Sequence, residues 1–101
     1  MDRASEIARM YDDLTEKKYG IRWDPQHRMA GFVGDVGKLS KIIMAKHGLR
    51  DMDNVDEQLA HELSDCLWSV LILAEAYDID LADEFMKTMT ELELRIGSGR
   101  A

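Results

Sequence analysis

Apolar side chains recur along this chain at spacings of three and four residues, the period of an amphipathic helix. Four of them follow this spacing in the first segment: Ile7, Met10, Tyr11 and Leu14. Gly20 comes next and is typical of a helix stop, so the pattern predicts a helix over residues 3–18. With one proline and seven glycines in the whole chain, helices joined by short connections are favoured over strands.

The second predicted helix begins where Asp24 is a good N-cap and Pro25 fits the first helical position, and it runs to about residue 46. One face of it is bulky and apolar and is expected to face the core: Met29, Val33, Val36, Leu39 and Ile43. The other face is small and charged: Gly31, Gly34, Asp35 and Lys38. Each helical glycine costs about 1 kcal/mol relative to alanine. The small face is therefore either a tight helix–helix contact or a surface open to a phosphate.

Asn54 is expected to cap the third helix, with Glu57 completing a capping box. A wide apolar face follows: Leu59, Leu63, Cys66, Leu67, Val70, Leu73 and Ala74. Leu71 and Ile72 make this helix apolar on more than one side, so we expect it to be central and heavily buried.

Asp80 caps a fourth helix that is expected to end near residue 96. Residues 1–101 are thus interpreted as one all-α domain, a four-helix bundle. Four short helices make a thin bundle. Apolar surface left on the third helix and on Phe85, Met86 and Met89 of the fourth predicts that dimerisation completes it.

The composition narrows the classes of function. A net charge of −7 argues against binding to a nucleic-acid polymer, whose phosphates would be repelled. No apolar run approaches the ~20 residues that span a bilayer, so no membrane association is expected. Cys66 is the only cysteine and cannot form an internal disulfide, which favours a cytoplasmic location.

Glu62 and Asp65 are the most informative pair of side chains. Their spacing of three places both carboxylates on one face of a helix, where they repel each other unless a cation lies between them. Mg²⁺ is the cation most often held in this way. An isolated pair is more often a solvated acidic patch, but the charged face with Asp35 and Lys38 makes a shared polar cleft the better interpretation.

The segment 34–39, Gly-Asp-Val-Gly-Lys-Leu, is followed by Glu62-Leu63-Ser64-Asp65. This combination resembles the two-part signature of MazG-like, all-α nucleoside triphosphate pyrophosphohydrolases, E-E-x-x-E on one helix and E-x-x-D on the next. The resemblance implies a MazG-like bundle, a homodimer or a dimer of dimers. It also implies hydrolysis of a nucleotide to the monophosphate and pyrophosphate with Mg²⁺, or alternatively Mn²⁺. The metal-binding and catalytic residues it implies are Asp35, Glu62 and Asp65.

The first motif is depleted, because Gly34 and Lys38 stand where the family has glutamates. The missing first glutamate is the group that would orient or deprotonate water. Lys38 repels Mg²⁺ but suits a phosphate. The resemblance also implies that Lys87 meets the substrate, although Glu91 stands where the family tends to carry asparagine. The alternative is a MazG-fold protein that binds a nucleotide or a protein partner without hydrolysis.

Trp23 and Trp68 are candidate platforms on which a nucleotide base could stack. Core packing is the competing interpretation, and it is stronger for Trp68 than for Trp23.

Overall fold

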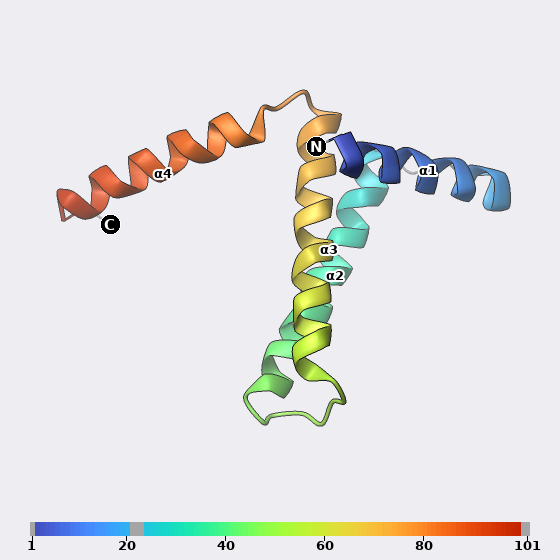
Figure 1. The fold of residues 1–101 in the computed structure, drawn as a ribbon, viewed down its shortest axis with the longest axis horizontal. Helices are drawn as coiled ribbons and strands as arrows, with labels where there is room; N and C mark the ends of the chain where they lie inside the picture. The colour runs from blue at the N-terminus through green and yellow to red at the C-terminus, as the bar shows by residue number, and fades with distance from the viewer. Residues whose placement is uncertain (1, 21–23, 100–101) are drawn as a thin grey trace.

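The computed structural model describes residues 2–20 and 24–99, and every regular element in these two ranges is an α-helix. The helices are α1 (Asp2–Tyr19), α2 (Pro25–Lys46), α3 (Val55–Ala76) and α4 (Leu81–Gly97). The all-α class and the four predicted helices are therefore confirmed. Figure 1 shows α2 and α3 as a central antiparallel hairpin, with α1 and α4 leaving the same end of it in different directions.

The ends of α2 follow from its sequence. The Asp24 side chain accepts a hydrogen bond of 3.0 Å from the His27 backbone N–H, which satisfies one of the donors left open at a helix start. At the other end Gly48 has φ +77°. The N–H groups of Gly48 and Leu49 donate to the carbonyls of Ala45 and Met44. This pair of bonds closes the last turn around a left-handed residue.

The start of α3 differs from the prediction. Asn54 is the N-cap residue, but it has a left-handed backbone with φ 52° and its side chain makes no capping hydrogen bond. The predicted capping box with Glu57 is therefore wrong, because a capping side chain needs an extended backbone at this position. Gln58 stabilises the turn instead, and its Nε2 donates to the Asp53 carbonyl at 2.7 Å.

The face of α2 that contacts α3 lies between the two expected faces. Ile42 is completely buried, and Asp35 and Leu39 are half-buried. Most of the apolar set expected to face the core is exposed, between 42 and 58%: Met29, Val33, Val36 and Ile43. The prediction failed because helical spacing shows which residues share a face without saying which side of the helix meets its neighbour.

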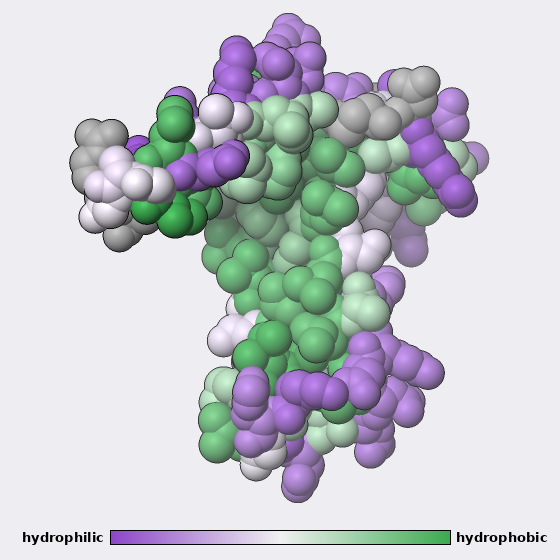
Figure 2. All heavy atoms as spheres, turned by 60° about the vertical axis from the view of Figure 1, so that its left-hand side comes forward, coloured by the Kyte–Doolittle hydropathy of each residue, from purple (hydrophilic) through white to green (hydrophobic). Residues whose placement is uncertain are grey.

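The expectation that α3 is heavily buried is also wrong for much of its surface. Its buried residues are Glu62, Ser69, Ile72 and Ala74, whereas Leu63 and Leu67 are more than half exposed. Together with the exposed apolar residues of α2, they form a continuous apolar surface. Figure 2 shows this surface as a broad green band along the hairpin.

The α4 helix extends away from the hairpin (Figure 1), and none of its residues is buried. A defined corner sets its direction. Asp78 has φ 55°, and the N–H groups of Asp78 and Ile79 donate to the carbonyls of Glu75 and Ala74. Asp80 then caps α4 by accepting from the Asp83 N–H at 3.1 Å.

Candidate functional site

A cavity of about 550 Å³ lies where α1, α2 and α3 meet. Its walls combine aromatic, small and charged side chains, which is typical of a small-molecule site. The aromatic residues are Tyr11, Phe32 and Trp68. The polar and charged residues are Arg28, Asp35, Ser64, Asp65 and Ser69. Helical spacing explains this wall: Arg28 and Asp35 lie seven residues apart on α2, and Asp65 and Trp68 lie three apart on α3.

Two of the three predicted acids meet at this cavity. Asp35 comes from α2 and Asp65 from α3, and both are half-buried in its wall. Asp65 Oδ2 also lies 3.2 Å from His61 Nε2, one turn earlier on the same helix. The prediction that two helices place carboxylates in one cleft is confirmed for this pair.

Glu62 is buried beside the cavity rather than lining it. Its side chain is 1% exposed, and Oε2 lies 3.6 Å from Lys38 Nζ. Its other oxygen, Oε1, has no hydrogen-bond partner. A buried carboxylate oxygen without a donor is unfavourable by a few kcal/mol. A cation or a donor reaching Oε1 would remove that penalty, so Glu62 is the best candidate ligand in the site.

The pKa of the Cys66 thiol shows that the three acids share one neighbourhood. Burial raises this pKa first, and the negative charges of Asp35, Glu62 and Asp65 raise it further. Each carboxylate is therefore close enough to Cys66 to disfavour a thiolate. Cys66 itself is half-buried in α3.

The acids do not converge on one point. Among the described side chains, no group of three or more histidines, cysteines, aspartates or glutamates is arranged to hold a metal ion. The carboxylate oxygens are nevertheless the donors that Mg²⁺ prefers, and the unpartnered Glu62 Oε1 is a free ligand position. The carboxylates therefore suit Mg²⁺ in their chemistry, whereas the arrangement of the described side chains does not form a metal site.

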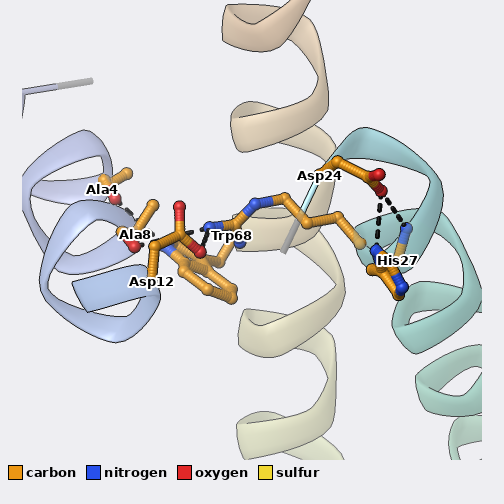
Figure 3. A network of polar contacts seen from close by, with 7 residues as sticks. Ala4, Ala8, Asp12, Asp24, His27 and Trp68 are labelled. Carbon is orange, nitrogen blue, oxygen red and sulfur yellow. Dashed lines mark hydrogen bonds and ion pairs between the residues drawn. The ribbon is translucent and has the colours of Figure 1, made fainter. Parts of the chain in front are cut away.

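Trp68 is held in place by contacts to α1 and α2 (Figure 3). Its indole Nε1 donates to the Ala4 carbonyl at 3.3 Å. The Arg28 guanidinium lies 5.6 Å from the ring centroid, within reach of a cation–π interaction. Because Trp68 also lines the cavity, part of its ring surface is available to a ligand.

Arg28 is the residue of this site that the sequence analysis missed. Its Nη2 lies 2.6 Å from Asp12 Oδ1 and also donates to the Ala8 carbonyl of α1 at 3.4 Å. The Arg28 and Asp12 side chains are only 9 and 14% exposed. The available signal was the spacing of seven residues between Arg28 and Asp35, which places both on one face of α2.

The remaining predicted residues lie elsewhere. Lys38 is 60% exposed and reaches Glu62 rather than the cavity. Lys87 lies on α4, outside the cavity lining, and pairs with Asp83 at 3.1 Å and Glu84 at 3.7 Å on its own helix. Trp23 falls outside the described residues.

The three glycines of α2 differ in what surrounds them. Gly31 lines the cavity. A Cβ atom placed on Gly34 or Gly37 would meet no heavy atom within 4 Å. Close helix packing within one chain therefore does not require glycine at positions 34 and 37, and the open-surface interpretation fits better there.

Within the described residues, no helix combines the length and the apolar character that crossing a membrane requires. Comparisons with protein-family models, with curated proteins and with solved structures find no match to this chain.

Proposed function

We propose that this protein is a Mg²⁺-dependent nucleotide pyrophosphohydrolase that converts an NTP or dNTP to the monophosphate and pyrophosphate. One observation carries the proposal: Asp35 and Asp65, from two helices, line one cavity with Trp68, beside the buried and unpartnered Glu62 Oε1. The sequence resemblance to MazG-like pyrophosphohydrolases supplies the reaction, and the side chains around this cavity supply suitable groups.

The roles follow from the chemistry of each side chain. Asp35, Glu62 and Asp65 would hold Mg²⁺, which when bound neutralises phosphate charge and activates water. Lys38 is mostly exposed, so its ammonium can turn from Glu62 toward a phosphate as a point charge. The Trp68 ring offers a surface on which a base stacks. A volume of about 550 Å³ lies within the range of pockets that enclose small ligands.

Binding without hydrolysis is the second candidate, and a specific contact favours it. Lys38 Nζ lies 3.6 Å from Glu62 Oε2, so a resident cation already offsets part of the charge that would attract Mg²⁺. Gly34 leaves no carboxylate to deprotonate water at its position on α2. A protein of this kind would bind a nucleotide in the same cavity and release it unchanged.

A product assay tests the proposal. Common and oxidised NTPs and dNTPs are incubated with Mg²⁺ and then Mn²⁺, and monophosphate and pyrophosphate are scored separately from diphosphate and phosphate. Glu62→Gln and Asp65→Asn keep the side-chain shapes while removing their charges, and we expect both to abolish turnover. Asp83→Asn on α4 is the matched control and should turn over normally.

Restoring the depleted motif gives a second test. Gly34→Glu introduces the first glutamate of the family pattern at a position whose added Cβ meets nothing within 4 Å. The variant should fold, because replacing a helical glycine stabilises a helix by up to about 1 kcal/mol. We expect its turnover to exceed that of the wild type.

The outcomes separate the two candidates. Monophosphate plus pyrophosphate, lost in Glu62→Gln and retained in Asp83→Asn, establishes the enzyme. A rise in melting temperature with a nucleotide, without product in the wild type or in Gly34→Glu, establishes the binding protein. Full activity in both Glu62→Gln and Asp65→Asn contradicts the assigned site.

A further inference from the structure

One chain leaves far more surface in solvent than a folded monomer of its mass. A compact protein of 11.6 kDa is expected to expose about 5,800 Å², whereas this chain exposes 7906 Å². Its radius of gyration is 17.1 Å, against about 13 Å for a compact domain of 100 residues. The excess of about 2,100 Å² per chain exceeds the ~800 Å² that each partner buries in a standard interface.

One side of the hairpin carries exposed apolar side chains, and we call it the uncovered face. It is made of residues that are 40–58% exposed: Met29, Val33, Val36, Ile43 and Met44 from α2, and Leu63 and Leu67 from α3. On each helix these residues lie about 120° around the axis from the residues at the α2–α3 contact. Because the two helices are antiparallel, this rotation places both sets on the same side of the hairpin. Figure 2 shows the resulting apolar band.

The α4 helix carries a second exposed apolar stripe. Its members are Phe85, Met89, Leu92 and Ile96, at spacings of four, three and four residues, and they are 37–64% exposed. Met29, Val33 and Val36 on α2 are spaced by four and three, and Ile43 follows seven residues after Val36. This is the spacing with which two helices interlock side chains along a shallow crossing.

The charges of the two helices are complementary. The α2 helix carries four bases and a single acid, Asp35. Arg28, Lys38 and Lys46 already pair with Asp12, Glu62 and Asp56, and Lys41 is the fourth base. The α4 helix is acidic; Asp83, Glu84, Glu91 and Glu93 outnumber Lys87 and Arg95. Lys41 borders the apolar residues of α2, and Glu93 borders the stripe of α4. Opposite charges beside two apolar stripes favour pairing between them.

We propose that the α4 stripe of one chain docks on the uncovered face of a second copy, mainly along α2, in a reciprocal two-fold dimer. The second copy is the occupant because the corner at Asp78 and the Asp80 cap direct α4 away from its own hairpin. A symmetric exchange covers both stripes in both chains at once. If all the excess surface were buried, the two chains would lose about 4,200 Å² together, which is within the range of obligate dimers.

Sedimentation velocity over a wide range of protein concentration tests the interface. The wild type should have twice the 11.6 kDa mass of one chain. Met89→Asp in the α4 stripe and Val33→Asp in the uncovered face should each weaken association by about 100-fold or more, because each buries a carboxylate in an apolar contact twice per dimer. Thr90→Asp adds the same charge outside the stripe and should leave the dimer intact.

Mixing the two interface variants distinguishes exchange between chains from folding back within one chain. In a mixed dimer, the intact α4 of Val33→Asp meets the intact face of Met89→Asp, so one contact is restored in full, while both carboxylates fall in the other contact, which can stay open to solvent. We expect the mixture to associate more tightly than either variant alone. Circular dichroism of each variant checks that helix content is unchanged.

Three results would overturn the proposal. The first is a wild type that is monomeric throughout the concentration range. The second is a dimer that survives both Met89→Asp and Val33→Asp. The third is a mixture that associates no better than its components, which places α4 on its own chain or elsewhere. None of these measurements depends on hydrolysis, so the proposed function and this interface can fail separately.

Discussion

The α1 and α4 helices leave the same end of the α2–α3 hairpin, and they are attached to it in opposite ways (Figure 1). The α1 helix buries Ser5 and Ala8 against the hairpin, and polar contacts connect it to both hairpin helices. Asp12 pairs with Arg28 of α2, and Trp68 of α3 donates to the Ala4 carbonyl. The α4 helix buries nothing, and Lys87 forms its ion pairs within the same helix.

The two helices differ in whether their contacts fix their position on the hairpin. Hydrogen bonds and a buried ion pair depend on geometry, so α1 has a defined place that forms one wall of the cavity. An apolar stripe is attracted to any complementary apolar surface, and the corner after α3 turns the α4 stripe away from its own hairpin. The first helix is therefore part of the candidate site, and the fourth is available to a second chain.

The largest expected effect comes from removing the attachment of α1. Arg28→Ala leaves Asp12 buried without its partner, and we expect the free energy of unfolding to fall by about 3 kcal/mol. Urea unfolding measures this change. Lys87→Ala, which removes the exposed ion pairs of α4, is the matched comparison and should cost less than about 0.5 kcal/mol. Equal losses in the two variants would contradict the contrast between α1 and α4.

The second effect concerns α4 and depends on protein concentration. If α4 docks on a second copy, each tenfold rise in concentration adds about 1.4 kcal/mol to the stability of the dimer, so the melting temperature of the wild type should rise. Phe85→Asp should remove this dependence. A wild-type melting temperature that is constant over a hundredfold range of concentration would count against the exchange of α4.

The third effect compares acids on the hairpin with acids on α4. Because burial and three carboxylates raise the pKa of the Cys66 thiol above its ordinary value of 9.0, its alkylation should begin at a higher pH than that of a free thiol. Asp65→Asn removes one negative charge and should lower the pKa. Asp83→Asn should leave the alkylation profile unchanged. The measurement is the rate of Cys66 alkylation across pH. If both variants gave the same profile, Asp65 would not share a neighbourhood with Cys66.

The smallest effect compares the N-caps of α2 and α4. The His27 N–H bond lowers the pKa of Asp24 below its ordinary value of 3.8. The unfolded chain therefore binds protons more readily than the folded one, and the contribution of this cap is present above about pH 4 and lost as the pH falls through the folded pKa. Asp24→Ala should therefore make the free energy of unfolding, measured with urea, fall less steeply as the pH drops below about 4. Asp80→Ala, measured at concentrations where the chain is monomeric, should lower the helix content and leave the pH dependence of the free energy of unfolding unchanged.

The sequence alone was sufficient to predict the helices. Their apolar periodicity is local, and so are the signals at their ends, such as Asp24 with Pro25 and the glycine at position 48. Spacing within a helix also showed which residues share a face, such as Arg28 and Asp35 on α2, whereas the meeting of Asp35 and Asp65 at one cavity depends on how α2 and α3 pack. Asn54 is the exception, since its left-handed backbone prevents the capping box that its neighbours suggest.

Other features were decided only by the tertiary structure. Periodicity divides α2 into two faces, but the contact with α3 falls between them, at Asp35, Leu39 and Ile42, and leaves Val33 in solvent. The pairing of Arg28 with Asp12 joins residues sixteen positions apart on different helices, and no local pattern predicts it. The burial of Glu62 and the separation of α4 likewise depend on how whole helices are placed. The sequence by itself therefore determined the helices and the residues that share a face, because these depend on local spacing, whereas packing between distant segments decided which faces are covered.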